Sequence, residues 1–543
     1  MAIHAHGPVI VTACPGAGKT RVMVARNLRM LKDGIEPAAI LNVTFTKKAA
    51  EEFSSRLTKA HPHGKDVSVS TIHALAYRII LNVTHRKPNI INHNVALNWA
   101  RNIDFDAPED VLNRISRART GSHVSDADKK LANQYLEFLK KNHATDLDGI
   151  ILLAQPLIKT WCNHHSVKAM MVDEFQDTDS AQWHFIKKLT QTTSADFFAV
   201  GDEHQSIYGF RGAMPYVFGF AIKDLQCKRL SLHECFRSLP HIIKASLPTI
   251  ITTPATQAVT VNAVRKTDDS QPDNQVRYIP CGTPINQARS LVKVVRDLQM
   301  KGVKNHEIAI LSRTRDGITI PNMMLNAAHI PTHAESWQNP FKSKIRRTVL
   351  GLVRYMAGSI ELDTFVTNAA ALGVMCDVKS VEALKTYQDD FEMFFEKAAR
   401  LYHGWARKSA MHALEVTREA FENNWQQLEK RCLKMTEKPE SNKHGVTLAT
   451  VHAAKGREWD AVIVIGADND NFPTPSAVSV EEERRILYVA MTRAKNHLTL
   501  LSSSSKMCDF LYARKKRTAK NLIKFPMRKS SQKESFMRRM WNA

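Results

Sequence analysis

The run Ala13-Cys14-Pro15-Gly16-Ala17-Gly18-Lys19-Thr20 constrains the fold more than any other part of the sequence. It follows a short apolar run, Val9 to Ala13, and precedes a helical pattern, Arg21 to Leu31. Between a strand and a helix, such a glycine-rich loop turns its backbone N–H groups toward phosphates, and the helix adds its positive end. Lys19 is then expected to reach the β- and γ-phosphates, and the Thr20 hydroxyl to ligate Mg²⁺. The sequence predicts a phosphate-binding P-loop.

An acidic pair supplies a second nucleotide motif. Asp173 and Glu174 follow the apolar run Ala169 to Val172, which reads as a buried strand. An Asp at the carboxyl end of a strand can hold Mg²⁺, and an adjacent Glu can polarise the attacking water. Together with the P-loop, this pair predicts a hydrolytic site.

Two sets of short apolar runs alternate with helical patterns, which predicts an α/β fold with two parallel sheets flanked by helices. The first set is Val9 to Ala13, Ala39 to Thr44, Val67 to Thr71, Ala169 to Asp173 and Phe197 to Gly201. The second set is Val276 to Pro280, Glu307 to Leu311, Thr447 to Thr450, Ala461 to Gly466 and His497 to Leu501. A mainly helical insertion interrupts each set.

Length and charge narrow the class of protein. A chain of 543 residues is too long for a single core, so three or four structural units are expected. The net charge of +23 favours a polyanionic partner such as nucleic acid, although a solvated basic surface is the alternative. No run of eighteen apolar residues or signal peptide is found, so we expect a cytoplasmic protein that does not bind a membrane. The eight cysteines include no CxxC pair, which disfavours a zinc site.

Further motifs follow in one order along the chain, and together they resemble the UvrD/Rep/PcrA family of superfamily 1 DNA helicases. They are Val43 to Ala50 (VTFTKKAA), Ser70 to Ala76 (STIHALA), Val172 to Thr178 (VDEFQDT), Val200 to Ala213 (VGDEHQSIYGFRGA), Cys235 to Ser238 (CFRS), Thr450 to Trp459 (TVHAAKGREW) and Glu481 to Lys495 (EEERRILYVAMTRAK). The resemblance covers residues 8 to about 505.

The resemblance implies two RecA-like P-loop domains, each with a mainly helical inserted subdomain. The expected boundaries are 1–80 and 168–227 for the first RecA-like domain, 81–167 for its insertion, 228–335 and 443–505 for the second, 336–442 for its insertion, and 506–543 for a basic C-terminal tail. Both insertions look shorter than those of typical family members.

The resemblance also implies roles at an ATP site. Arg237 and Arg493 would reach the γ-phosphate from the second domain, and Gln205 would contact it or position the water. The catalytic set is therefore Glu174, Gln205, Arg237 and Arg493, with Mg²⁺ at Thr20 and Asp173. ATP binding would use Ala13, Cys14, Pro15, Gly16, Ala17, Gly18, Lys19, Thr20, Arg21, Phe236 and Glu458. Phe236 replaces the usual adenine-stacking Tyr and keeps an aromatic face.

For single-stranded DNA, the resemblance implies aromatic stacking by Phe45, Tyr208 and Phe210. Polar contacts would come from Thr71, His73, Arg313, Thr450 and His452. Phe210 stands where the family usually has Trp. Lys19 lies too near the start of the chain for the upstream Gln that reads adenine in the family, so either several nucleotides are accepted or the start is truncated.

The resemblance thus implies an ATP- and Mg²⁺-dependent helicase or translocase that moves 3′→5′ on single-stranded DNA and at single-strand/duplex junctions. The alternative is an ATP-regulated DNA-binding accessory subunit that works beside a separate nuclease. Compact proteins of this kind resemble the helicase partner of Gabija-type anti-phage systems, while others serve DNA repair or plasmid maintenance. The biological pathway stays open at this point.

Overall fold

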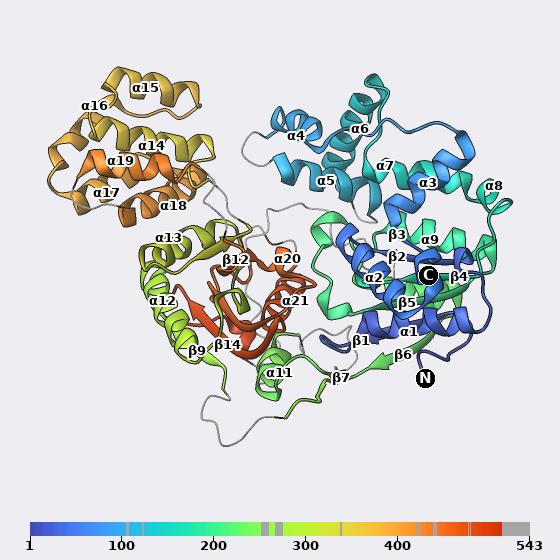
Figure 1. Cartoon of the computed structure of the whole chain (residues 1–543). Coiled ribbons are helices and arrows are strands. Elements are labelled where there is room, and N and C mark those ends of the chain that lie inside the picture. Colours follow the sequence, from blue (N-terminus) through green and yellow to red (C-terminus); the bar gives the residue numbers. More distant parts are fainter. Residues whose placement is uncertain are drawn as a thin grey trace, which may run out of the picture.

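The computed structural model describes residues 1–104, 108–121, 124–250, 260–266, 275–336, 339–420, 424–437, 442–475, 477 and 479–512. These residues form two halves, each built on a parallel β-sheet with helices on both faces and a separate group of helices above it (Figure 1). The α/β fold with two parallel sheets flanked by helices agrees with the prediction.

The first sheet has the strand order β3-β2-β4-β5-β1-β6, and every pairing in it is parallel. Its strands are β1 (Val9–Ala13), β2 (Ile40–Thr44), β3 (Ser68–Thr71), β4 (Ala169–Val172), β5 (Asp196–Gly201) and β6 (Lys228–Leu232). Its main helices are α1 (Lys19–Lys32), α2 (Lys47–Ala60), α3 (Ile72–Thr84), α7 (Leu147–Ala154), α8 (Ile158–Cys162), α9 (Ser180–Thr193) and α10 (Val217–Leu225). The central strands are apolar and buried because helices cover both faces.

The second sheet, also parallel throughout, has the order β11-β12-β10-β13-β14-β9. Its strands are β9 (Arg277–Pro280), β10 (Ile308–Ser312), β11 (Thr332–Ala334), β12 (Val446–Thr450), β13 (Trp459–Ile465) and β14 (Ala494–Ser502). Its helices are α11 (Pro240–Ser246), α12 (Pro284–Met300), α13 (Thr319–Ala327), α20 (Val451–Ala454) and α21 (Val480–Met491). Helix α21 faces the first half (Figure 1).

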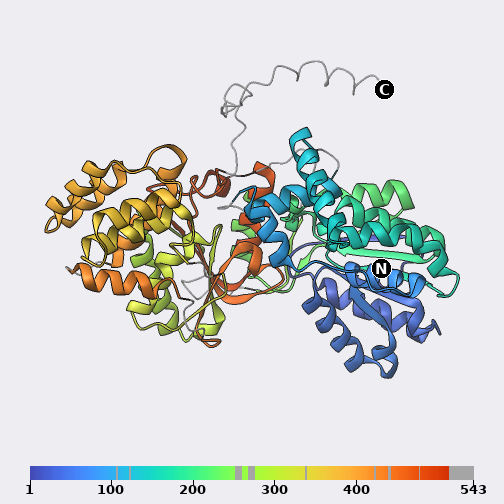
Figure 2. The same cartoon turned by 90° about the horizontal axis from the view of Figure 1, so that it is seen from above.

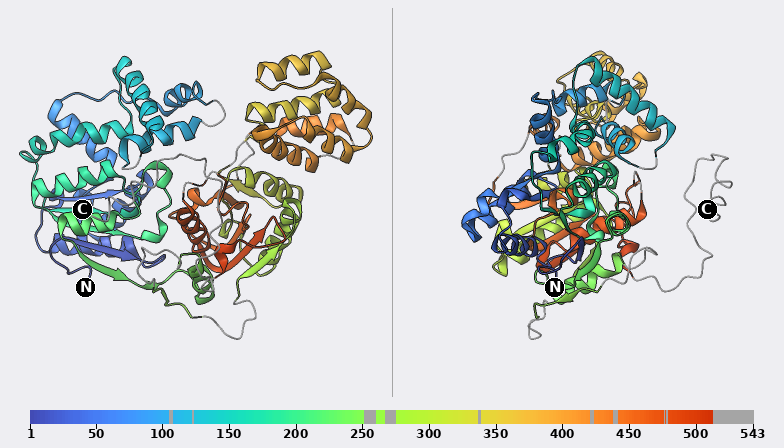
Figure 3. Two further views of the ribbon diagram at one scale, coloured as in Figure 1. Left: turned by 180° about the vertical axis from the view of Figure 1, so that it is seen from behind. Right: turned by 90° about the vertical axis from the view of Figure 1, so that its right-hand side faces the viewer.

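The two helical insertions stand on the same side of the molecule, one above each sheet (Figures 1 and 3). The first consists of α4 (His93–Arg101), α5 (Pro108–Thr120) and α6 (Asp126–Lys141), which share a hydrophobic cluster of their own. The second consists of α14 (Lys344–Met356), α15 (Leu362–Ala371), α16 (Val378–Glu382), α17 (Phe391–Arg400), α18 (Gly404–Ala420) and α19 (Trp425–Lys434). Its larger cluster is distinct from the core of the second sheet.

The chain passes from the first sheet to the second once, directly after β6. A short parallel ribbon of β7 (Glu234–Cys235) and β8 (Asn262–Ala263) lies at this passage, and α11 lies between these two strands in the sequence. From above, the two halves lie side by side (Figure 2). The two halves are therefore held together by this one stretch of backbone and by the contacts between their facing surfaces.

The structure differs from the predicted boundaries in three places. Strand β6 pairs with β1, so the first sheet extends to Leu232 and not only to residue 227. Helices α7 and α8 pack in the core of the first sheet, so the independent part of the first insertion is narrower than 81–167. Met507, Cys508, Phe510 and Leu511 are buried in the second half and do not belong to a tail, while 513–543 lie outside the described residues.

Each of the ten predicted strands is present, with ends within three residues of the predicted ones. Strands β6, β7, β8 and β11 were not predicted. Among the described residues, no helix is both long and apolar enough to cross a membrane.

Candidate nucleotide site and nucleic-acid interface

The P-loop lies at the carboxyl end of β1, where it touches the passage between the two halves. Gly16 and Gly18 have φ values of 72° and 77°, a region that glycine enters without a steric penalty. The Gly16 carbonyl accepts a hydrogen bond from the N–H of Phe236 at 3.1 Å. A Cβ on Gly16 would lie 2.6 Å from the Cβ of Arg237, so this close approach also requires glycine. The loop and the CFRS motif form one structural unit.

Helix α1 begins directly at the P-loop lysine. Gly18 is its N-cap residue, and among the described residues no side chain caps the helix and no acidic residue occupies its first turn. Its first N–H groups therefore suit an anionic phosphate, since no competing carboxylate lies in that turn. Lys19 and Thr20 occupy this turn, and Arg21 is exposed beside them.

The two carboxyl groups after β4 lie opposite the P-loop lysine. The Lys19 Nζ is 3.8 Å from the Glu174 Oε2, and the N–H of Glu174 donates to the Asp173 carboxylate at 2.9 Å. Burial raises the pKa of Asp173, and the adjacent Glu174 raises it further. Burial opposes ionisation of Glu174 as well, but Lys19 and Lys455 hold the pKa of Glu174 below its ordinary value. The two lysines therefore favour the ionised form of Glu174.

Glu174 also has an uncommon backbone conformation. Its φ is 49° and its ψ is 44°, the left-handed region that residues other than glycine seldom adopt. The side-chain NH₂ of Gln176 donates to the Glu174 carboxylate, and the side-chain Oε1 of Gln176 accepts the N–H of Asp202. Strained residues that neighbours hold in place are concentrated at functional sites. These contacts fix the direction of the Glu174 carboxylate.

Two arginines reach this site, Arg493 from the second half and Arg237 from the passage between the halves. Arg237 Nε contacts the Glu458 carboxylate at 2.5 Å, and Lys495 lies 3.1 Å from the same group. Arg493 is only 2 % exposed, and its Nη2 donates to the Gln205 Oε1 at 2.9 Å. Burial and the nearby Arg237 lower the pKa of Arg493 to about 9, so the guanidinium is still charged at neutral pH. The predicted catalytic residues are thus brought together across the two halves.

An aromatic cluster lies a few residues beyond Gln205. The rings of Phe45 and Tyr208 are stacked at 5.2 Å with an interplanar angle of 20°. Phe210 is 6.0 Å from Tyr208, and His452 of the second half lies 5.4 Å from Phe210. Three aromatic residues of the first half and one histidine of the second half therefore share one partly exposed surface.

His452 is a neutral side chain in this cluster. Burial lowers its pKa to about 3, and the nearby Arg313 adds to the effect. Its Nε2 is 3.2 Å from the carbonyl oxygen of Ile207 in the first half, and since a carbonyl can only accept, the nitrogen donates. His452 consequently links the halves as an uncharged donor.

The same short pattern follows one strand in each sheet. Thr71 ends β3 and caps α3 by accepting the N–H of Ala74, while Thr450 ends β12 and caps α20 by accepting the N–H of Ala453. His73 and His452 lie two residues beyond these caps. Each cap satisfies one of the free N–H groups of its helix. The two threonines are therefore placed equivalently on the two halves, and both are partly exposed.

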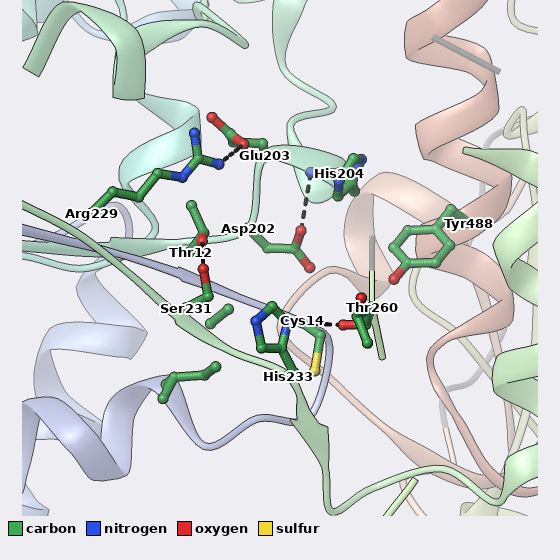
Figure 4. A pocket seen from close by; sticks show the side chains of 12 residues that line it. Thr12, Cys14, Asp202, Glu203, His204, Arg229, Ser231, His233, Thr260 and Tyr488 are labelled. Atoms are coloured by element: carbon green, nitrogen blue, oxygen red, sulfur yellow. Dashed lines mark hydrogen bonds and ion pairs between the residues drawn. The ribbon is translucent and has the colours of Figure 1, made fainter. Parts of the chain in front are cut away.

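A small polar cavity adjoins the P-loop on the side of β6 (Figure 4). Its volume is about 70 Å³, and its lining includes Cys14, Asp202 and Tyr488, the last on α21. The cavity is polar and large enough to hold water.

Comparisons with known proteins follow the same division into two halves. A family model described as the UvrD/REP helicase N-terminal domain matches residues 1–129 and 101–226. One described as the UvrD-like helicase C-terminal domain matches residues 382–505.

The chain belongs to the UvrD/REP helicases.

Similar members of this family align with most of the chain. The ATP-dependent DNA helicase PcrA of Staphylococcus epidermidis is 26 % identical, over 92 % of this chain and 82 % of its own length. The putative ATP-dependent DNA helicase YjcD of Bacillus subtilis is 26 % identical, over 91 % of this chain and 76 % of its own length. The PcrA of Staphylococcus aureus is 24 % identical, over 92 % of this chain and 82 % of its own length.

In this UvrD/REP helicase, a buried ion pair joins the two halves. The sequence did not predict this contact. Lys455 Nζ contacts the Asp177 carboxylate at 2.5 Å and the Gln205 carbonyl oxygen at 2.7 Å. The two side chains are 7 % and 1 % exposed, and burial raises the pKa of Asp177 to about 6 although Lys455 opposes this. Both residues lie inside motifs of the sequence, but only the fold shows that they meet.

One residue that was predicted to contact DNA pairs with a carboxylate of the protein instead. Arg313, after β10, makes a bidentate ion pair with Glu483 of α21, at 2.6 and 2.9 Å. The Glu483 side chain is only 3 % exposed, so the pair is strong and directional. On the opposite side of the nucleotide site, Phe236 is 55 % exposed and thus free to offer a ring face.

Replacing Tyr208 with Ala should weaken binding to single-stranded DNA by about 5- to 150-fold, since base stacking contributes roughly 1–3 kcal/mol. The dependence of affinity on salt should stay the same, because phosphate contacts set it. Fluorescence anisotropy with an oligothymidine at several salt concentrations measures both. Tyr278→Ala, at an exposed ring on β9, is the control and should bind as the parent does. Unchanged affinity of Tyr208→Ala would remove this cluster from the DNA path.

Proposed function

We propose that this UvrD/REP helicase hydrolyses ATP between its two RecA-like domains and uses it to move 3′→5′ along single-stranded DNA and to separate strands. One observation carries the proposal. The segment Gln205–Phe210 begins at the candidate γ-phosphate site and ends in the aromatic cluster. A change at Gln205 therefore has a short path to the stacking rings, because Tyr208 stands three residues and Phe210 five residues further along the backbone. The polarity follows the resemblance to the family.

At the nucleotide, we assign binding of the β- and γ-phosphates to Lys19 and to the first turn of α1. Thr20 and Asp173 would hold Mg²⁺, which helps to neutralise charge on the phosphates. Mg²⁺ usually keeps several waters and is bound by one or two protein ligands together with substrate phosphates, which fits this small donor set.

Glu174 is the proposed general base. It would accept a proton from the attacking water, and the contact with Gln176 that fixes its direction supports that role. Gln205 would orient the water or the γ-phosphate. Arg237 and Arg493 would stabilise charge that develops on the transferred phosphoryl group.

The base would lie outside the small polar cavity, near the exposed Phe236 ring and Arg21. Stacking on Phe236 needs only an aromatic face, so it discriminates weakly among bases. Glu458 would hold Arg237 in place while the nucleotide is bound, because their ion pair already fixes the guanidinium.

Each half would bind the DNA through stacking or polar side chains that lie close to a capped helix N-terminus. Phe45, Tyr208 and Phe210 would stack on bases from the first half. Thr71 and His73 on that half, and Thr450 and His452 on the other, would contact the backbone from equivalent positions. Arg313 would do so only if its pair with Glu483 opens.

The test is the ATP hydrolysis rate of the purified chain with and without single-stranded DNA, followed by strand displacement from substrates with a 3′ or a 5′ overhang. We expect strong stimulation by DNA and displacement only with the 3′ overhang. Displacement from the 5′ overhang alone would overturn the polarity. Little hydrolysis in either condition would favour the alternative of an accessory subunit that acts beside a separate nuclease, in anti-phage defence or repair.

A further inference from the structure

Helix α21 lies along the seam between the two halves and ends at a proposed catalytic arginine. It spans Val480–Met491, and its 12 residues make it about 18 Å long. The chain continues from its last turn through Thr492 to Arg493. The opposite end of the helix carries two adjacent carboxylates, Glu482 and Glu483, which are 6 % and 2 % exposed. Buried carboxylates need partners, and theirs lie on different halves.

Glu482 reaches into the first half and holds the loop that carries the aromatic rings. Its carboxylate accepts the N–H of Gly209 at 2.8 Å. A Cβ on Gly209 would lie 2.6 Å from the Glu482 Oε2, so the contact requires glycine at this position. Gly209 stands between Tyr208 and Phe210 in the sequence. The position of both rings thus depends on one carboxylate of α21.

Arg485, three residues further along α21, holds the same segment nearer the nucleotide. Its Nε donates to the carbonyl oxygen of Ser206 at 2.7 Å. Residues three apart on a helix share one face, so Glu482 and Arg485 point to the same side. With the hydrogen bond from Arg493 to Gln205, helix α21 and the residue that follows it contact this segment at three points. The two segments run antiparallel, because the contacts occur in opposite order along them.

Glu483 points to the other side and holds Arg313 of the second half. Consecutive residues on a helix diverge by about 100°, which explains how adjacent carboxylates serve different halves. The start of α21 therefore touches one candidate DNA-binding element of each half, while its end touches the nucleotide site.

We propose that Glu482 and Arg485 are positioning residues that transmit the state of the nucleotide site to the DNA-stacking loop through α21. Neither is placed against nucleotide or DNA, and each acts through the backbone of Ser206 or Gly209. When Arg493 moves with the γ-phosphate, α21 moves with it, and these two contacts carry Tyr208 and Phe210 along. The inference rests on the proposed function and adds to it the parts that connect its two sites.

The experiment compares Glu482→Ala with Glu482→Gln in the full chain. Both are assayed for basal ATP hydrolysis, DNA-stimulated hydrolysis, the KM for ATP and affinity for an oligothymidine. Glu482→Ala should lose at least about tenfold in stimulation by DNA, while its basal rate and KM change by less than about twofold. Glu482→Gln should recover most of the stimulation, because its amide oxygen can still accept the Gly209 N–H.

Glu481→Ala is the matched control, since Glu481 is the exposed neighbour on the same helix turn. It should be stimulated as the parent is. Thermal unfolding of every variant detects loss of the fold. If Glu482→Ala does not fold, Gly209→Ala replaces it, because its methyl group opposes the same contact from the other side. Arg485→Ala should reproduce the loss of stimulation, since it breaks the contact with Ser206.

Two results would overturn the inference. One is normal DNA stimulation in Glu482→Ala and Arg485→Ala. The other is a parallel fall of basal and stimulated rates that Glu482→Gln does not rescue, which is the behaviour of a contact with a structural role only. A parent chain that DNA does not stimulate contradicts the proposed function instead, so the two failures are distinguishable.

Discussion

Glu174→Gln should lower the DNA-stimulated rate of ATP hydrolysis by about 10²–10⁴-fold, the usual contribution of a positioned general base. The substitution keeps the size of the side chain and an oxygen that can accept the amide of Gln176. It removes the negative charge that faces Lys19 at 3.8 Å. Affinity for single-stranded DNA should change by only several-fold, because the aromatic cluster is untouched.

The measurement is steady-state hydrolysis at saturating ATP, with DNA affinity determined in parallel. Asp297→Asn is the control, because Asp297 is a half-exposed carboxylate paired with Arg277 far from the P-loop. It should hydrolyse ATP as the parent does. A Glu174→Gln enzyme that retains full activity would exclude Glu174 as the base and would return the search to Asp173.

Arg493→Lys should reduce the stimulated rate by about 10³-fold or more, which is the low end of the effect of an arginine that stabilises a transferred phosphoryl group. Lysine keeps the positive charge but cannot bind Gln205 and a phosphate oxygen at once in a planar arrangement. In the structure the guanidinium also donates to the carbonyl oxygens of Val489 and Arg457, so its position is fixed from three sides.

Single-turnover hydrolysis separates this effect from ATP binding, since the KM should change far less than the rate. Arg277→Lys, in the half-exposed pair with Asp297, is the matched control and should be fully active. A rate within about tenfold of the parent would indicate that Arg237 alone serves the γ-phosphate. Loss of ATP affinity with an unchanged rate would instead make Arg493 a binding residue.

The sequence was most informative where several constraints coincide. The strands around the P-loop are buried on both faces, so each is visible in the sequence as an unbroken apolar run. The motifs then mark where these runs end. Strand β6 escaped prediction because it is an edge strand with the half-exposed sequence Lys228 to Leu232. Because β6 pairs with β1, the first sheet ends at Leu232 and not at the predicted residue 227.

The contacts within the site were harder to predict than its members. Lys455 and Asp177 are 278 residues apart, and Arg313 and Glu483 are 170 apart. Each residue taken alone suits a solvent-exposed role, and only the packing of α21 and the motif loops buries it. The prediction of Arg313 as a DNA contact accordingly overlooked a partner that lies in another motif.

The single passage of the chain between the two sheets has a mechanical consequence. When a motor of this kind pulls against a load, tension between its halves runs through one stretch of backbone, His233–Leu239, and through the side-chain contacts of the seam. That stretch is also bonded to the P-loop through Phe236 and Gly16. The backbone stretch that resists separation is therefore hydrogen-bonded directly to the loop that would hold the phosphates, so strain in one reaches the other through that contact.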